Sequence, residues 1–254
     1  MLSYQLFCGK LQIDATCFSV QVKGWCNMAN MLSTVKNCEL FKELSDCVIQ
    51  EQILPYGFLQ VYQKGQFLIM PQQRMDHLGL ILSGKVQILH IFADGRYSLM
   101  NVLDSEDIMA IDLVCTRKQL SPYHAMATGN VQIYWIPVTL FTQPGKIAEA
   151  DRLHCLRNML LLIADENMKK EYRLAILSQK GLRERIISYL MMQSNRRRKT
   201  TFAISFSREE LAAYLCVNRS ALSHELSLMQ QEGLISFHKN IFTLQNISAS
   251  SLNR

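Results

Sequence analysis

Between residues 58 and 136 the chain shows short apolar runs, several of which alternate with the two-residue period of β-strands. Turn signals separate them, and the clearest is Asp94-Gly95, which favours a two-residue hairpin. Short helices are predicted ahead of them, at residues 37–41 and 44–46. Many antiparallel strands at this spacing predict a small barrel or roll. The predicted strands cover residues 58–62, 66–70, 78–82, 85–92, 97–103 and 131–136.

Past Pro144 the period of the apolar positions changes to that of a helix. Over residues 153–177 these positions fit a heptad repeat, with Asn167 at a core position, where asparagine favours two-stranded pairing in a fixed register. Lys170 falls in the same seam, so a helix that packs only on its own domain is the alternative. The predicted seam comprises Leu153, Leu156, Leu160, Ile163, Asn167, Leu174 and Leu177.

Residues 205–244 show the spacing of two short helices with a tight turn, followed by a β-hairpin. Ser207 and Glu210 predict a capping box on the first helix, and Asn218 is a suitable N-cap for the second. This layout predicts a winged helix-turn-helix, which places its second helix in the DNA major groove. The apolar side of that helix comprises Leu222, Leu226 and Met229, and its polar side comprises Arg219, Ser220, Ser223, His224 and Ser227.

The charge of the chain is concentrated in the same C-terminal part. Residues 178–254 hold 11 basic and 5 acidic residues, whereas residues 1–177 hold 16 of each, so the net charge of +6 lies in the last 77 residues. An amphipathic helix pair with a solvated polar face is the alternative, but a basic domain on a neutral body favours double-stranded DNA as the partner. Helix-turn-helix proteins commonly bind two half-sites through a two-fold axis, so we expect a homodimer paired through the heptad helix.

The composition excludes several classes of protein. With 49% hydrophobic and 19% charged residues, the chain resembles an ordinary globular protein. The sequence shows no apolar run of about 18 residues and no secretory signal pattern, so we expect a cytoplasmic protein without a membrane segment. It also shows no phosphate-binding loop, nucleophile elbow or metal-spaced cluster. We therefore expect neither an enzyme nor a metal site.

The predicted order of β-roll, long helix and winged helix-turn-helix resembles the Crp/Fnr family of bacterial transcription regulators. The resemblance covers residues 31–246, and its distinctive residues lie at 37–45, 81–86, 94–96, 218–223 and 232–235. It implies an α+β fold with an N-terminal antiparallel β-roll of the cyclic-nucleotide-binding type. The implied parts are an extension at 1–30, an effector domain at 31–146, a dimerisation helix with its hinge at 147–178, and a DNA-binding domain at 179–247. The extension is interpreted as the product of an upstream start codon, and the alternative is a sensory arm.

The resemblance also implies roles for side chains of the second helix. Arg219 occupies the position of an arginine that reads guanine, and Ser220 that of a frequent glutamate. Ser223 and His224 occupy the next base-reading turn. The chain departs from the family at His224, where arginine is usual, and at Cys216, where glycine is usual, so no operator sequence carries over. The expected contacts to the DNA backbone are Ser207, Arg208, Asn218, Ser227 and Lys239. If the protein is an activator, RNA polymerase is a further expected partner.

The effector is expected to differ from a cyclic nucleotide. In family members that bind cyclic AMP, a Gly-Glu pair and an Arg-Ser pair hold the ribose and the phosphate. The corresponding pairs here are Ala110-Ile111 and Ser121-Pro122, which offer no carboxylate and no guanidinium. We expect a small apolar or aromatic effector, and the alternative is a collapsed pocket with constitutive DNA binding. The pocket is predicted at Met109, Ile111, Tyr123 and His124.

The cysteines leave oxygen or redox sensing open as the alternative function. An iron–sulfur cluster would use Cys8, Cys17 and Cys26 with Cys115, but the nine-residue spacing of the first three is unlike known cluster loops. A thiol switch at Cys115 or Cys155 has no supporting pattern. We therefore expect no cofactor.

Overall fold

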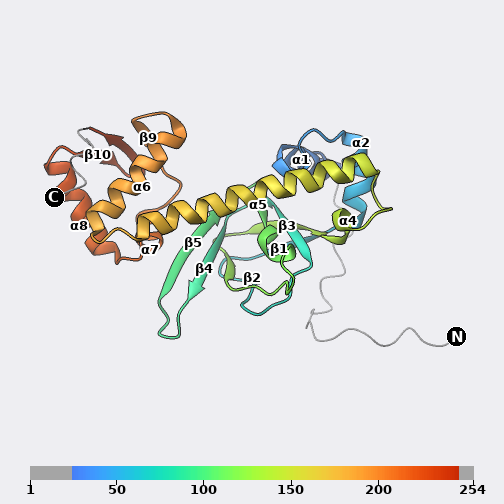
Figure 1. Ribbon diagram of the computed structural model, residues 1–254, viewed down its shortest axis with the longest axis horizontal. Coiled ribbons are helices and arrows are strands. Elements are labelled where there is room, and N and C mark those ends of the chain that lie inside the picture. Colours follow the sequence, from blue (N-terminus) through green and yellow to red (C-terminus); the bar gives the residue numbers. More distant parts are fainter. Residues whose placement is uncertain (1–24, 246–254) are drawn as a thin grey trace.

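The computed structural model describes residues 25–245, with side chains from residue 31 onward. A long helix, α5 (Glu149–Leu177), extends along most of the molecule and lies against the β-roll (Figure 1). Short N-terminal helices lie near one end of α5 and a small C-terminal domain lies at the other. We call this domain, residues 182–245, the head. The arrangement confirms the predicted α+β fold of roll, long helix and helix-turn-helix domain.

Short helices precede the roll, as the sequence predicts around residues 37–46. The first of them, α1, begins inside the predicted extension, so the expected boundary at residue 31 divides a helix. The rest of that extension, residues 1–24, lies outside the described residues. Leu40 and Phe41 are buried in the core of the roll and anchor the helical segment to it. These elements are α1 (Trp25–Asn37), η2 (Glu39–Phe41), α2 (Asp46–Val48), η3 (Ile49–Ile53) and η4 (Leu54–Tyr56).

The roll is built from two antiparallel sheets, ordered β1-β8-β3-β6 and β2-β7-β4-β5. The six predicted strands are confirmed to within one residue at each end. The structure adds β6, β7, α3 and α4, which are too short to show a period in the sequence. The strands are β1 (Phe58–Tyr62), β2 (Phe67–Ile69), β3 (His77–Ser83), β4 (Val86–Ile91), β5 (Tyr97–Leu103), β6 (Ile108–Met109), β7 (His124–Ala127) and β8 (Val131–Pro137), with the short helices α3 (Ile111–Val114) and α4 (Thr139–Thr142).

Helix α5 ends at Leu177, at the end of the predicted segment 147–178 of dimerisation helix and hinge, and the head follows. The sequence did not predict the first two elements of the head, α6 (Leu182–Arg197) and β9 (Thr201–Ala203). Strand β9 pairs with β11 and so extends the predicted hairpin to a three-stranded sheet, β10-β11-β9. The other elements are present as predicted, namely α7 (Arg208–Tyr214), α8 (Arg219–Gln231), β10 (Ile235–His238) and β11 (Ile241–Leu244).

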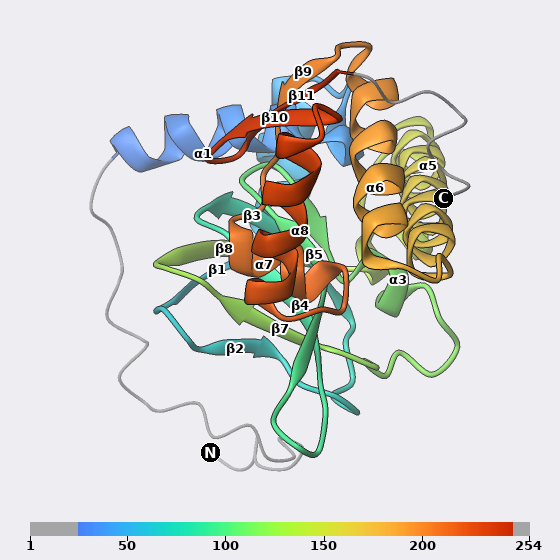
Figure 2. The ribbon, with the colours of Figure 1, turned by 90° about the vertical axis from the view of Figure 1, so that its left-hand side faces the viewer.

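Two hydrophobic cores stabilise the molecule. The first fills the roll and includes Cys155 and Met159 of α5. The second fills the head, yet it also contains Leu89 of β4 and Leu99 of β5. The head therefore packs directly on its own roll, beside the sheet that contains these strands (Figure 2).

Candidate DNA-binding and effector sites

Helix α7 is the first helix of the helix-turn-helix, and local hydrogen bonds define both of its ends. The Ser207 hydroxyl accepts from the Glu210 N–H, and the Glu210 carboxylate accepts from the Ser207 N–H, which confirms the capping box. At the other end the Val217 N–H donates to the Ala212 carbonyl, a pattern that ends many helices around one left-handed residue. That residue is Cys216, with a φ of 57°. Glycine, usual here in the family, adopts this conformation without strain.

Helix α8 turns an apolar side to the core of the head and a polar side to solvent. The Asn218 side chain accepts from the Ala221 N–H, which confirms the predicted N-cap. The three predicted apolar residues, Leu222, Leu226 and Met229, are completely buried. On the other side Ser223 is half-buried and three base-reading candidates are exposed, namely Arg219, Ser220 and His224. The structure thus brings the four predicted base-reading residues onto one accessible helix face.

The predicted backbone contacts fall into two groups. Ser207, Arg208 and Lys239 line a pocket of about 300 Å³ between the start of α7 and the wing, which is the hairpin of β10 and β11. The Arg208 guanidinium lies 4.9 Å from the centre of the Phe237 ring and donates to the Lys239 carbonyl. These contacts hold Arg208 against the wing. The second group lies at α8 and comprises Asn218 and Ser227.

An ion-pair cluster that the sequence did not predict fixes α8 to α6. The Arg183 guanidinium pairs with Glu225 at 2.6 Å and with Glu232 at 2.7 Å. Hydrogen bonds to both carboxylates raise the pKa of Arg183. The two glutamates are seven residues apart and therefore share one face of a helix. This spacing is the sequence signal that could have indicated a common basic partner. The ion pairs therefore hold α8 in a fixed position relative to α6.

Two of the predicted pocket residues, Met109 and Ile111, flank the start of α3, which contacts α5. Ala110 has a left-handed φ of 64°, at the position of the family's glycine. Ser121 is completely buried, and its hydroxyl donates to the Tyr123 carbonyl and accepts from the Tyr123 N–H. The Ser121 hydroxyl is therefore already engaged by the protein backbone. Met109, Ile111 and Tyr123 are buried in the core of the roll. His124 instead pairs with Leu89, a residue of the second core, so it lies on the outer face of its sheet and is not brought together with the other three.

Asp112 joins the effector region to the long helix, a contact that the sequence did not predict. The Tyr123 hydroxyl donates to one of its oxygens at 3.1 Å, and the Lys170 ammonium pairs with the other at 3.0 Å. Burial, and then the charge of Asp112, raise the pKa of Tyr123, so its hydroxyl stays protonated and donates. Lys170 therefore points to the roll, although the heptad pattern places it in the seam.

The outer face of α5 carries an exposed apolar stripe. Leu153, Leu160 and Leu174 form one predicted row of the seam and are 55%, 67% and 63% exposed. Leu156 and Ile163, from the other predicted row, pack partly against the core of the roll. A helix that lies on a domain can offer only its outer side to a partner. Further exposed apolar residues on α5 are Leu161, Met168 and Tyr172, and Asn167 is also exposed.

Among the side chains that the structure describes, those of residues 31–245, no group of three or more His, Cys, Asp or Glu could hold a metal ion. Burial raises the pKa of both Cys38 and Cys155 to about 12, so both thiols are protonated at neutral pH. Cys115 is exposed, while the side chains of Cys8, Cys17 and Cys26 lie outside the described part of the chain. The predictions about an iron–sulfur cluster and a thiol switch stay predictions.

Among the helices that the structure describes, none has the length and apolar character needed to cross a bilayer.

Comparisons with known proteins agree with this architecture. The family of cyclic nucleotide-binding domains matches residues 59–143, and the Crp-like helix-turn-helix domain matches residues 184–249. The transcriptional activator protein FnrL of Cereibacter sphaeroides is 24% identical over 195 residues, which cover 73% of this chain and 74% of FnrL.

Solved structures show the same fold. A CooA mutant from Carboxydothermus hydrogenoformans is 18% identical with a TM-score of 0.62, and the match covers 81% of this chain and 88% of CooA. The regulator CLP of Xanthomonas campestris is 16% identical with a TM-score of 0.61, and the match covers 80% of this chain and all of CLP (100%). Since one chain carries both family domains in the order roll, α5 and head, it belongs to the Crp/Fnr family of transcription regulators.

Proposed function

We propose that this regulator binds a two-half-site DNA operator as a homodimer, with its affinity set by a small effector other than a cyclic nucleotide. The observation that carries the proposal is the exposed polar face of α8, in a head that follows a helix with an exposed apolar stripe. Arg219 lies at the start of α8, where its guanidinium can reach a guanine edge. RNA polymerase is a further partner if the protein is an activator.

The exposed stripe of α5 supports the homodimer. Several large apolar side chains exposed along one side of a helix are unusual on the surface of a monomer. Leu153, Leu160 and Leu174 are separated by multiples of seven residues, so they recur along one face of the helix. Two copies packed along this stripe would bury it and place two heads side by side, as a palindromic operator requires.

The effector region supports a ligand without a phosphate. Ala110, Ile111 and Ser121 carry neither a free cation nor a free carboxylate, and Lys170 is already paired with Asp112. For this chain we favour an apolar or aromatic effector against Met109 and Ile111.

DNA selection tests the proposed function. The full chain is incubated with a randomised duplex library, and the bound fragments are sequenced and measured by gel shift. We expect one inverted-repeat sequence to be enriched, and binding to it should be at least about a thousandfold tighter than to random DNA. Enrichment without any common sequence would contradict the proposal.

Replacing Arg219 with alanine should reduce the discrimination between the selected operator and random DNA by about 1–3 kcal/mol, because a bidentate contact to guanine is lost. Gel shifts on both duplexes measure this difference, and Arg96→Met, on the exposed β4–β5 hairpin, is the control. Equal losses on the two duplexes would show that Arg219 contacts only phosphate.

Thermal unfolding tests the effector class. Cyclic AMP, cyclic GMP and c-di-GMP at millimolar concentration should leave the melting temperature unchanged, because only a ligand that binds the native state stabilises it. A library of small aromatic and aliphatic acids, amines and phenols is screened in the same way. A saturable rise with any cyclic nucleotide would refute the proposed effector class.

A further inference from the structure

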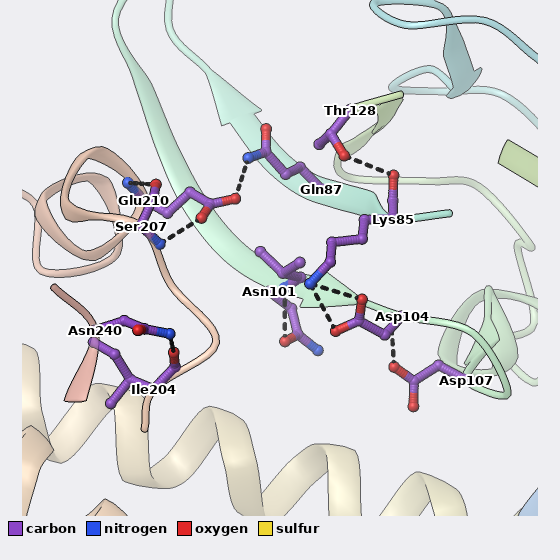
Figure 3. A network of polar contacts seen from close by, with 11 residues as sticks. Lys85, Gln87, Asn101, Asp104, Asp107, Thr128, Ile204, Ser207, Glu210 and Asn240 are labelled. Carbon is purple, nitrogen blue, oxygen red and sulfur yellow. Dashed lines mark hydrogen bonds and ion pairs between the residues drawn. The ribbon is translucent and has the colours of Figure 1, made fainter. Parts of the chain in front are cut away.

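The head is held on the roll by polar contacts as well as by the shared core. The Gln87 side chain on β4 donates to the Glu210 carboxylate at 2.8 Å (Figure 3). Glu210 is also the capping residue that accepts from the Ser207 N–H, so one carboxylate joins the roll to the start of α7. The other end of α7 is joined to the roll by a different group of residues.

That group is centred on Arg173 of α5, whose residue surface is only 8% exposed. Its guanidinium donates to the Ser98 hydroxyl of β5 at 2.9 Å and to the Tyr214 carbonyl at the end of α7 at 3.3 Å. It also lies 5.0 Å from the centre of the Tyr214 ring and 3.9 Å from the Cys216 sulfur. We call Arg173, Ser98, Tyr214 and Cys216 the Arg173 joint. It connects the long helix, the roll and the helix-turn-helix.

The joint depends on the docked position of the head. Within the described residues, no carboxylate forms an ion pair with Arg173, and its Nε has no hydrogen-bond partner. A buried guanidinium is costly unless several acceptors surround it. Here the acceptors come from two separate bodies, Ser98 from the roll and Tyr214 from the head. If the head rotated, the cation would lose the acceptor from the head, so the planar, forked guanidinium favours one orientation.

Cys216 gives this chain a contact that glycine could not make. Its left-handed φ of 57° is unfavourable for a residue with a side chain. Its sulfur, however, lies 3.4 Å from the Ser98 hydroxyl and close to Arg173. The departure from the family's glycine therefore coincides with the point where the turn meets the roll.

We propose that Arg173 is the positioning residue that orients the DNA-reading head on its own roll and so sets the half-site spacing that the dimer accepts. Its contacts are with Met100, Ser98, Tyr214 and Cys216, none of which is a base-reading residue, so it acts through the end of α7 and the turn before α8. The inference rests on the proposed binding of two half-sites.

The test varies the spacing between half-sites. The operator selected by the wild-type protein is remade with its half-sites moved together or apart by one or two base pairs, and a duplex with one half-site is added. Each added base pair rotates one half-site by about 34° and shifts it by about 3.4 Å, so a rigidly held pair of heads should lose at least about tenfold in affinity.

Arg173→Met should reduce this preference to about threefold or less while affinity for the single half-site stays within about twofold, since the reading face is intact. Arg96→Met should keep the wild-type spacing profile. Cys216→Gly removes the sulfur and places at this left-handed position a residue that adopts the conformation without strain. It should also weaken the preference for one half-site spacing. This variant provides the test if Arg173→Met does not fold.

An unchanged spacing profile in the folded Arg173→Met protein, or equal losses on single and paired half-sites, would overturn the proposal. If Arg173→Met does not fold, an unchanged profile in Cys216→Gly overturns it. Failure of the wild-type protein to select any paired operator would instead refute the proposed function.

Discussion

Leu160→Glu should convert the proposed homodimer to a monomer. Leu160 is the most exposed large apolar residue of α5, at 67%, and lies in the middle of the helix. In a two-fold pair each dimer would bury two added carboxylates against an apolar surface, so the dissociation constant should rise on the order of a hundredfold or more. Sedimentation measures the change in mass, and gel shifts should show loss of paired half-site binding with the single half-site retained.

The control is Leu120→Glu, at a leucine of the roll that is 38% exposed and outside α5. It should stay dimeric with wild-type operator affinity. A Leu160→Glu protein that remains a dimer would exclude the stripe as the interface, and a wild-type protein that is already monomeric would exclude the proposed assembly.

Leu226→Ala should destabilise the head by about 2–5 kcal/mol, because it removes a completely buried side chain and leaves a cavity. Leu226 packs in the second core with Leu211 and Phe242, so the cavity lies between the reading helix, α7 and the wing. This loss is a large part of the stability of an ordinary domain. Urea unfolding followed by circular dichroism measures it, and operator affinity should fall as the head unfolds.

Ile241→Ala is the matched control in the same head, since Ile241 is 46% exposed on the wing. It should cost about 1 kcal/mol or less. Equal effects of the two substitutions would show that α8 is not packed through Leu226.

The accuracy of the sequence predictions followed the strength of the local pattern. Strands β1 and β5, helix α5 and the two caps of the head were predicted because each has its own period or capping residues. Strand β6 and helix α3 were missed because two to four residues carry no period. Helix α6 was missed although it is long, since its exposed basic end resembles a solvated loop.

The candidate DNA-binding face was also predictable, because α8 is one continuous helix and its polar side follows from its spacing. The effector region was predicted only in part. The resemblance to the family drew attention to Ala110 and Ser121, but the pairing of Asp112 with Lys170 joins residues 58 positions apart. No local pattern indicates such a pair.

By itself the sequence determined the order of roll, helix and head and the polar face of α8. Only the tertiary structure decided which side of α5 packs on the roll. As a result Lys170 pairs with Asp112 of the roll rather than lying in the predicted seam, and Arg173 is part of the Arg173 joint. The physical reason is that periodicity arises from neighbours along the chain, whereas a buried cation is stabilised by acceptors that folding brings from distant segments.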